Sequence, residues 1–328
     1  MDQKSDLVGA EKMVDSENTL RQLISELKKI DDSIRRSIES VVSLESKIAQ
    51  LLAGLPGGSQ SAGARAIPEM PRPKPVPTAP RDPPKVVGEK VSIGVEKVNE
   101  LLVGGIRLGT NALLTGPPFS GKYVLAWNFV ASSLEEGIPV VVISTDRDIG
   151  ELKYEISRIY RQVDEAEESG LLRFVDIYSR SVQAQPSSRY ASIIDSTSNI
   201  SSLIRVSEQI GTEIRKNYPF YRLIFSSLNS YIAELDDKIL VKFVQQFTQK
   251  RKVENAVSIY LIDEGQSERR VSDSISYLFD GIVEFKTDAS RNFLRVSGLG
   301  NVRSRDWIEL YLNEISFDLG SFTLEKIR

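Results

Sequence analysis

The sequence predicts an α/β domain with a mostly parallel sheet flanked by helices, closed by antiparallel strands and preceded by a long coiled-coil helix. Three observations lead to this prediction. Short apolar runs alternate with amphipathic stretches after residue 86, a glycine-rich loop pattern follows the first of these runs, and a heptad repeat occupies residues 20–52. We expect a coiled-coil helix over 1–53, a proline- and glycine-rich linker over 54–86 and a globular domain over 87–328.

Composition narrows the chemistry that the chain can perform. The 328 residues include neither cysteine nor histidine, which excludes disulfides, thiolate chemistry and histidine-based catalysis or metal binding. The net charge of −3 gives no overall sign of nucleic-acid binding, so a nucleic-acid partner is not expected. The chain begins without a signal peptide and has no run of about 18 apolar residues. We therefore expect no membrane span and a cytoplasmic location.

The N-terminal heptad repeat has the pattern of a left-handed coiled coil. Nine of its ten core positions are apolar; the positions are Leu20, Leu23, Leu27, Ile30, Ile34, Ser37, Val41, Leu44, Ile48 and Leu51. In the second half of the repeat, isoleucine or valine at the a positions with leucine at the d positions favours a parallel dimer, whereas Ile24, Ile38 and Leu52 widen the apolar stripe enough for a higher oligomer. Residues 20–52 are therefore expected to form a homo-oligomer or to bind a partner helix. A single amphipathic helix folded onto its own domain is the alternative.

Residues 54–85 hold nine of the fourteen prolines and several glycines. Proline removes a backbone donor and fixes the backbone, so this segment is expected to form neither helix nor sheet. The stretch 71–77 should adopt polyproline II and act as a solvated spacer, with a docking peptide or a weak nucleic-acid contact as the alternative.

The globular part is expected to contain six parallel strands separated by helices. The apolar runs that predict these strands are 112–115, 140–144, 172–177, 223–225, 257–262 and 281–285. A helix is expected over 122–134, directly after the loop pattern. The stretch 290–328 alternates apolar and polar residues, which is typical of antiparallel strands.

Residues 116–123 match the phosphate-binding pattern G-x-x-x-x-G-K-[ST] except at its last position. The predicted nucleotide-binding residues are Gly116, Pro117, Pro118, Phe119, Ser120, Gly121, Lys122 and Tyr123. The glycines allow backbone N–H groups to surround a phosphate chain, and Lys122 would reach the β- and γ-phosphates. Tyr123 stands where a short hydroxyl normally holds Mg²⁺, but its phenol oxygen lies about 6 Å from its own Cα and cannot replace that hydroxyl.

Two interpretations of this loop remain open. In one, the N–H groups of residues 120–123 bind the phosphates of ATP or ADP. In the other, the loop binds nothing, because Pro117 and Pro118 lack N–H groups and Phe119 is bulky.

The stretch 94–102, the double glycine Gly104-Gly105 and the phosphate loop together resemble the opening of RecA-superfamily ATPases. The similarity is to the KaiC-like branch common in archaea, which includes the archaellum protein FlaH. The resemblance extends through most of residues 88–328 and includes the segments 139–148, 222–229, 257–264 and 278–285. It implies a RecA-like P-loop NTPase fold and ATP or ADP as the ligand.

Several positions depart from the pattern of active relatives. Thr145 and Asp146 stand where relatives carry glutamates that polarise the attacking water, and Ser226 stands where the Walker B aspartate holds Mg²⁺. The Lys-x-Arg that touches a neighbour's γ-phosphate is replaced by Ser297 and Leu299, although Arg303 and Arg305 follow shortly after.

Asp263 follows an apolar run on the next strand of the resemblance and is the candidate that could supply a missing carboxylate. It would then be a metal ligand together with Ser226, and a catalytic residue together with Asp146. The simpler alternatives are that Asp263 ends a strand and that Asp146 or Asp148 caps a helix.

These departures predict a degenerate KaiC-like protein that binds ATP or ADP with weak or no hydrolysis. Its role would be regulatory, in signal transduction, or that of a scaffold acting through the coiled coil. One alternative is an active Mg²⁺-dependent ATPase in which Asp263 and Asp146 replace the usual acidic residues. Another is a recombinase-related protein that handles DNA. The sequence leaves Mg²⁺ binding open because its expected protein ligands are absent.

Overall fold

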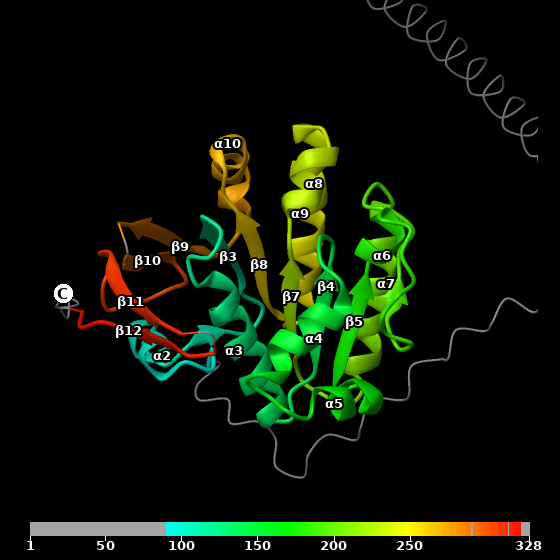
Figure 1. Cartoon of the computed structure of the whole chain (residues 1–328), viewed down its shortest axis with the longest axis horizontal. Helices are drawn as coiled ribbons and strands as arrows, with labels where there is room; N and C mark the ends of the chain where they lie inside the picture. Colours follow the sequence, from blue (N-terminus) through cyan, green and yellow to red (C-terminus); the bar gives the residue numbers. More distant parts are fainter. Residues whose placement is uncertain (1–89, 290, 314, 323–328) are drawn as a thin grey trace, which may run out of the picture. The chain divides into compact units, whose positions relative to one another are not determined.

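The structure is a computed structural model that describes residues 90–322 except 290 and 314, with the backbone alone described for 266–270 (Figure 1). The predicted coiled coil over 20–52 and the linker over 54–86 lie outside the described residues. None of the described helices is long and apolar enough to cross a membrane.

The described residues form a ten-stranded sheet in the order β12-β11-β10-β9-β3-β8-β7-β4-β5-β6. The seven strands from β9 to β6 run parallel: β9 (Gly281–Asp288), β3 (Asn111–Gly116), β8 (Val257–Asp263), β7 (Arg222–Ser226), β4 (Val140–Ser144), β5 (Leu172–Asp176) and β6 (Ser192–Ile193). The other three extend the sheet in antiparallel fashion: β10 (Arg291–Gly298), β11 (Ile308–Leu312) and β12 (Phe317–Leu319). The expected strands and the antiparallel C-terminal part are confirmed.

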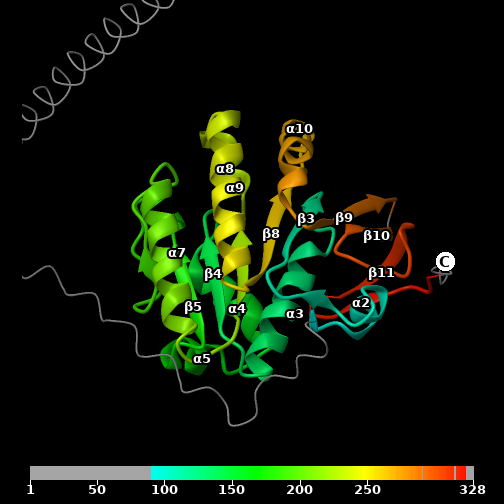
Figure 2. The same ribbon diagram turned by 180° about the vertical axis from the view of Figure 1, so that it is seen from behind.

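Helices cover both faces of the parallel part, as a comparison of Figures 1 and 2 shows. One face carries α3 (Lys122–Glu135), α4 (Ile149–Ser157) and α5 (Val163–Ser169). The other carries α7 (Ile200–Ile214), α8 (Asn229–Glu234), α9 (Asp237–Val253) and α10 (Gln266–Ile275). The smaller elements are α2 (Glu96–Leu101), α6 (Tyr178–Ser181), the 3₁₀ turn η1 (Ser276–Leu278) and a separate ladder of β1 (Lys90–Val91) with β2 (Ile106–Arg107).

The central strands are apolar throughout because they are buried on both faces. In β4, Val140 and Val142 belong to the core beneath α3 and α4, whereas Val141 and Ile143 belong to the core beneath α7 and α9. This alternation follows from the two-residue period of a strand. A strand with one polar face would leave polar groups buried here, which explains why the sequence shows continuous apolar runs.

The core beneath α9 is built around Phe225 of β7. Its ring lies 5.6–6.2 Å, centroid to centroid, from four other aromatic rings, which are Tyr231, Phe243, Phe247 and Tyr260. Phe225 is completely buried. Aromatic contacts of this kind hold α8 and α9 against β7 and β8, the two strands whose ends form part of the candidate site.

Steric constraints explain why the second residue of the Gly104-Gly105 pair is glycine. Gly105 adopts φ = +108°, and a Cβ on this residue would lie 2.1 Å from the carbonyl oxygen of Val91. Only glycine therefore allows β1 and β2 to pair at the entrance to the domain.

We predict that Phe225→Ala lowers the free energy of unfolding by about 3–5 kcal/mol, because it opens a cavity among packed rings. Guanidinium chloride unfolding of the full chain, followed by tryptophan fluorescence, measures the change; Trp127 and Trp307 are the two tryptophans. The matched control is Tyr154→Ala, whose side chain is exposed and which should change stability by roughly 0.5 kcal/mol or less. Equal effects of the two substitutions would contradict this account of the core.

Candidate functional site

The carboxyl ends of four parallel strands meet at one edge of the sheet, where open α/β sheets bind ligands. Gly116 at the end of β3 pairs in register with Asp263 at the end of β8, and Ser144 of β4 pairs with Ser226 of β7. The predicted phosphate loop lies between β3 and α3 at this edge. The strand order thus brings Asp263 beside the loop although the two are 140 residues apart.

The two glycines of the loop are required by its geometry. Gly116 adopts φ = +151°, and a Cβ there would lie 2.4 Å from the carbonyl oxygen of Phe285. Gly121 adopts φ = +99°, and a Cβ there would lie 2.5 Å from Leu312 Cδ1. Larger residues would push these neighbours away, so both positions depend on glycine.

The start of α3 offers backbone donors to an anion. Gly121 is its N-cap residue, and no side chain caps the helix. The first N–H groups of a helix have no carbonyl one turn earlier to bond and attract negative charge. Phe119, which is 97% exposed, points into solvent and does not fill the loop. The loop therefore has the donors that phosphate binding needs.

Lys122, the loop lysine, is completely buried and surrounded by oxygen atoms. Its Nζ donates to the carbonyl oxygens of Gly116 (3.1 Å) and Pro117 (2.8 Å) and forms an ion pair with the Asp263 carboxylate. An ammonium group has three donors, and three oxygens face this one. Burial lowers the pKa of Lys122, and the hydrogen bond to Asp263 opposes that shift.

Tyr123 bonds to the same carboxylate. Its hydroxyl donates to Asp263 Oδ2 at 2.7 Å. Burial raises the pKa of Tyr123, as do the negative charges of Asp146 and Asp263, so the phenol stays protonated and acts as a donor. Tyr123, which departs from the motif, therefore has a defined contact, because its long side chain reaches Asp263 at the end of β8.

Asp263 is held from its backbone as well. The Asn229 side chain donates to the Asp263 carbonyl (2.7 Å) and accepts from the Asp263 N–H (2.9 Å). The next N–H, that of Glu264, donates to the Gly116 carbonyl at 2.9 Å. Asp263 thus both ends β8 and faces the loop, which combines the two interpretations of the sequence.

Asp146 follows β4 and is the second carboxylate near Tyr123. It accepts a hydrogen bond from the Ser227 hydroxyl at 2.6 Å, but its Oδ1 is buried with no hydrogen-bond partner in the described residues. Burial raises the pKa of Asp146, and the Asp263 charge raises it further. Asp146 does not cap α4; Asp148 does, by accepting from the Gly150 N–H at 2.7 Å.

Ser226, the residue at the Walker B position, is completely buried. Its hydroxyl has no hydrogen-bond partner in the described part of the chain. The neighbouring Thr145 is turned inward too, because its hydroxyl donates to the Ser227 carbonyl at 2.7 Å. The structure therefore brings together Lys122, Tyr123, Asp146 and Asp263, and leaves Ser226 beneath them.

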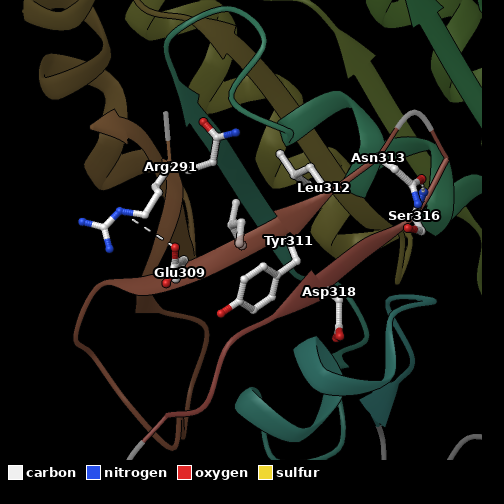
Figure 3. A pocket seen from close by; sticks show the side chains of 9 residues that line it. Arg291, Glu309, Tyr311, Leu312, Asn313, Ser316 and Asp318 are labelled. Carbon is white, nitrogen blue, oxygen red and sulfur yellow. Dashed lines mark hydrogen bonds and ion pairs between the residues drawn. The ribbon is translucent and has the colours of Figure 1, made fainter. Parts of the chain in front are cut away.

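A pocket of about 750 Å³ opens beside Tyr123, Asp146 and Asp263, whereas Lys122 is completely buried and does not line it. Its lining residues are Pro118, Phe119, Gly121, Tyr123, Val124, Asp146, Arg147, Glu155, Asp263, Leu312 and Asn313. Leu312 and Asn313 end β11 and also line a second, open pocket of about 410 Å³ on the antiparallel part of the sheet. Figure 3 shows the Arg291–Glu309 ion pair at one end of that second pocket, with Asn313 and Ser316 at the other.

Sequence reasoning assigned no role to several residues of the first pocket. Arg147 donates to both carboxylate oxygens of Glu155, at 2.5 and 3.0 Å, and its guanidinium lies 5.6 Å from the centre of the Tyr123 ring. Leu312 and Asn313 come from the far end of the chain. Asn229 lies inside a segment of the family resemblance, which is the one signal that could have pointed to its role.

The donor set does not fit Mg²⁺. The motif hydroxyl is replaced by Tyr123, Ser226 is buried and neutral, and Asp263 is already paired with Lys122. No group of three or more Asp, Glu, His or Cys side chains within the described ranges could hold a metal ion.

We predict that Asp146→Asn stabilises the domain at pH 7–8 by about 1 kcal/mol, because it removes a buried charge that lacks full compensation. The pKa of Asp146 is higher in the folded protein than the ordinary value of about 3.9 expected in the unfolded chain. The wild type therefore becomes more stable as the pH falls from above the folded-state pKa to that ordinary value. The difference in free energy of unfolding between Asp146→Asn and wild type should therefore become smaller at acidic pH. Urea unfolding across that pH range measures it, and a variant less stable than wild type at pH 8 would contradict the prediction.

Comparisons with known proteins bear on the family and the fold of this chain. A family model described as "ATPase: KaiC" matches residues 91–305. The chain is 30% identical over 127 residues to the UPF0273 protein MK0039 of Methanopyrus kandleri, covering 38% of this chain and 50% of that protein. It is 26% identical over 103 residues to a UPF0273 protein of Aeropyrum pernix, covering 31% of this chain and 42% of that protein. The chain thus spans half or less of the length of these curated relatives.

A solved structure shares the fold. The crystal structure of the KaiC-like protein PH0186 from Pyrococcus horikoshii superposes with a TM-score of 0.56 at 17% identity, covering 71% of this chain and 99% of that one. The predicted RecA-like architecture is thereby confirmed. Because the family model covers well over half of the sequence, the chain belongs to the KaiC-like ATPase family of the RecA superfamily.

Proposed function

We propose that this protein is a nucleotide-binding member of the KaiC-like family that binds ATP or ADP at the loop of residues 116–123 and hydrolyses ATP slowly or not at all. The observation that carries the proposal is the pairing of Asp263 with both Lys122 and Tyr123. The loop and helix that bind phosphates are retained, whereas the group that would organise Mg²⁺ is committed to contacts within the protein.

Binding is supported by the loop itself. Its two glycines have conformations that a side chain would disrupt, and the first turn of α3 has no side-chain cap. An open pocket adjoins the loop, with Val124 and Leu312 supplying apolar surface for the nucleoside. Phe119 and the two prolines do not obstruct this arrangement, because the Phe119 side chain points outward.

Slow hydrolysis is supported by the acidic and neutral groups around the loop. Phosphoryl transfer depends on cations that neutralise charge on the transferred group. Here the loop lysine faces a carboxylate, and the residue at the Walker B position is a buried serine. One oxygen of Asp146 accepts a hydrogen bond from the Ser227 hydroxyl, and the carboxylate lies in a buried setting that disfavours its charge.

A regulatory or scaffolding role follows from these two properties together with the predicted coiled coil. A module that binds a nucleotide without consuming it reports nucleotide concentration rather than performing work. The heptad repeat over residues 20–52 would then set the assembly or recruit a partner helix.

We predict that Lys122→Ala weakens nucleotide binding about ten- to a hundredfold, since it removes the loop cation and leaves the Asp263 charge uncompensated beside the phosphates. Titration of a fluorescent ADP analogue into the full chain measures the dissociation constant. Arg291→Ala, which removes a cation from the other pocket, serves as the control and should leave the constant unchanged. Unchanged binding by Lys122→Ala would exclude the loop as the site.

We further predict that Tyr123→Thr makes ATP binding depend on Mg²⁺, so that the variant binds ATP about tenfold more tightly when the metal is present. The threonine restores the motif hydroxyl and frees one oxygen of Asp263. Tyr123→Phe, which removes only the phenol oxygen, is the matched control and should gain no dependence. If Tyr123→Thr stays independent of Mg²⁺, the tyrosine is not what prevents metal binding.

A further inference from the structure

The contacts among Lys122, Asp263 and Tyr123 affect whether the site can accept a nucleotide with a third phosphate. In the phosphate-loop motif the lysine reaches the β- and γ-phosphates, and the hydroxyl after it holds the metal that bridges them. In this chain the lysine faces three protein oxygens and the following residue is a tyrosine bonded to Asp263. Both groups that serve a terminal phosphate are engaged inside the protein.

The backbone that carries this carboxylate is fixed on two sides. Asn229 bonds both the N–H and the carbonyl of Asp263, and the Glu264 N–H bonds the Gly116 carbonyl. The Asp263 backbone is therefore tied to α8 and to the loop at once. Its side chain is only 28% exposed; one oxygen forms the ion pair with Lys122 and the other accepts the hydrogen bond from Tyr123.

A second carboxylate lies on the same side of the loop. Asp146 contributes to the negative field at Tyr123 and has a buried oxygen with no hydrogen-bond partner in the described residues. Arg147, the cation beside it, is bound to Glu155 through two hydrogen bonds. A third phosphate placed here without a metal would meet negative charge, and like charges in close contact cost several kcal/mol in other complexes, which is a large factor in affinity.

The groups that bind a β-phosphate differ from those that serve the terminal phosphate. The β-phosphate is bound mainly by backbone N–H groups of the loop and by the start of α3, and these donors are intact in this chain. A nucleoside diphosphate can therefore accept hydrogen bonds from these N–H groups, and it has no third phosphate for the Asp263 and Asp146 carboxylates to repel.

We propose that the site selects nucleoside diphosphates, bound without metal, over nucleoside triphosphates, and that Asp263 is the residue that sets this preference. The inference rests on the proposed function, because it names the ligand class of the same loop. Asp263 acts as an internal anion in the position that a terminal phosphate would need, and Tyr123 fixes its orientation.

The test is competition of ADP and ATP against a fluorescent ADP analogue bound to the full chain, in EDTA and in Mg²⁺. Wild type should bind ADP about tenfold or more tightly than ATP under both conditions. Asp263→Asn keeps the shape and an acceptor for Tyr123 but removes the charge, so it should bring the two affinities to within about threefold. The matched control is Glu264→Gln, which removes the same charge from the adjacent residue, whose carboxylate accepts from Thr115, and it should retain the wild-type preference.

The outcomes separate the two proposals. Equal binding of ADP and ATP by wild type, or tighter binding of ATP, would overturn the preference while leaving nucleotide binding intact. No binding of either nucleotide by wild type would overturn the proposed function and this inference with it. If Asp263→Asn fails to fold, Asp146→Asn replaces it; this variant removes the second carboxylate beside the loop and should narrow the preference in the same direction, and an unchanged preference would count against the role of these charges.

Discussion

The site depends on one physical requirement, which is that the buried ammonium of Lys122 needs an anion. A cation removed from water is costly unless it is paired and hydrogen-bonded. In nucleotide-bound members of this fold class the phosphate is expected to serve that purpose. In this chain Asp263 serves it, and the contacts of Tyr123 and Asn229 keep Asp263 in place. Replacement of the motif hydroxyl by tyrosine is therefore part of a consistent arrangement, since only a long side chain reaches Asp263 from this position.

The features that position the loop are separate from those that would bind a metal. The glycine conformations, the parallel pairing of β3 with β8 and the aromatic core beneath α9 all serve to place the loop against the end of β8. None of them depends on a metal. Magnesium binding would need a short hydroxyl and a free carboxylate at the strand ends, and these are the features that the chain lacks. This arrangement supports the proposal that the protein recognises a nucleotide and turns it over slowly or not at all.

Much of the fold could be predicted from the sequence because it rests on local patterns. Continuous apolar runs such as that of β4 predict strands covered on both faces, and the glycine-lysine loop predicts a strand before it and a helix after it. The position of Asp263 near the loop was also within reach, since the family resemblance supplies the strand order. Its pairing with Lys122 was not, because that contact joins residues 141 positions apart and involves side-chain directions that no motif encodes. The contributions of Arg147, Glu155, Leu312 and Asn313 were missed for the same reason. The capping of α4 by Asp148 rather than Asp146 could not be decided either, because both residues stand at helix-start spacing and only the backbone geometry separates them.

The central claim is that the loop binds a nucleotide without engaging Mg²⁺. Calorimetric titration of ATP and ADP into the full wild-type chain, in Mg²⁺ and in EDTA at matched ionic strength, tests it most directly. The account predicts measurable binding with dissociation constants that agree within about threefold between the two conditions. Binding that requires Mg²⁺, or that tightens tenfold or more in its presence, would show that Asp263 is free to hold a metal and would contradict the account.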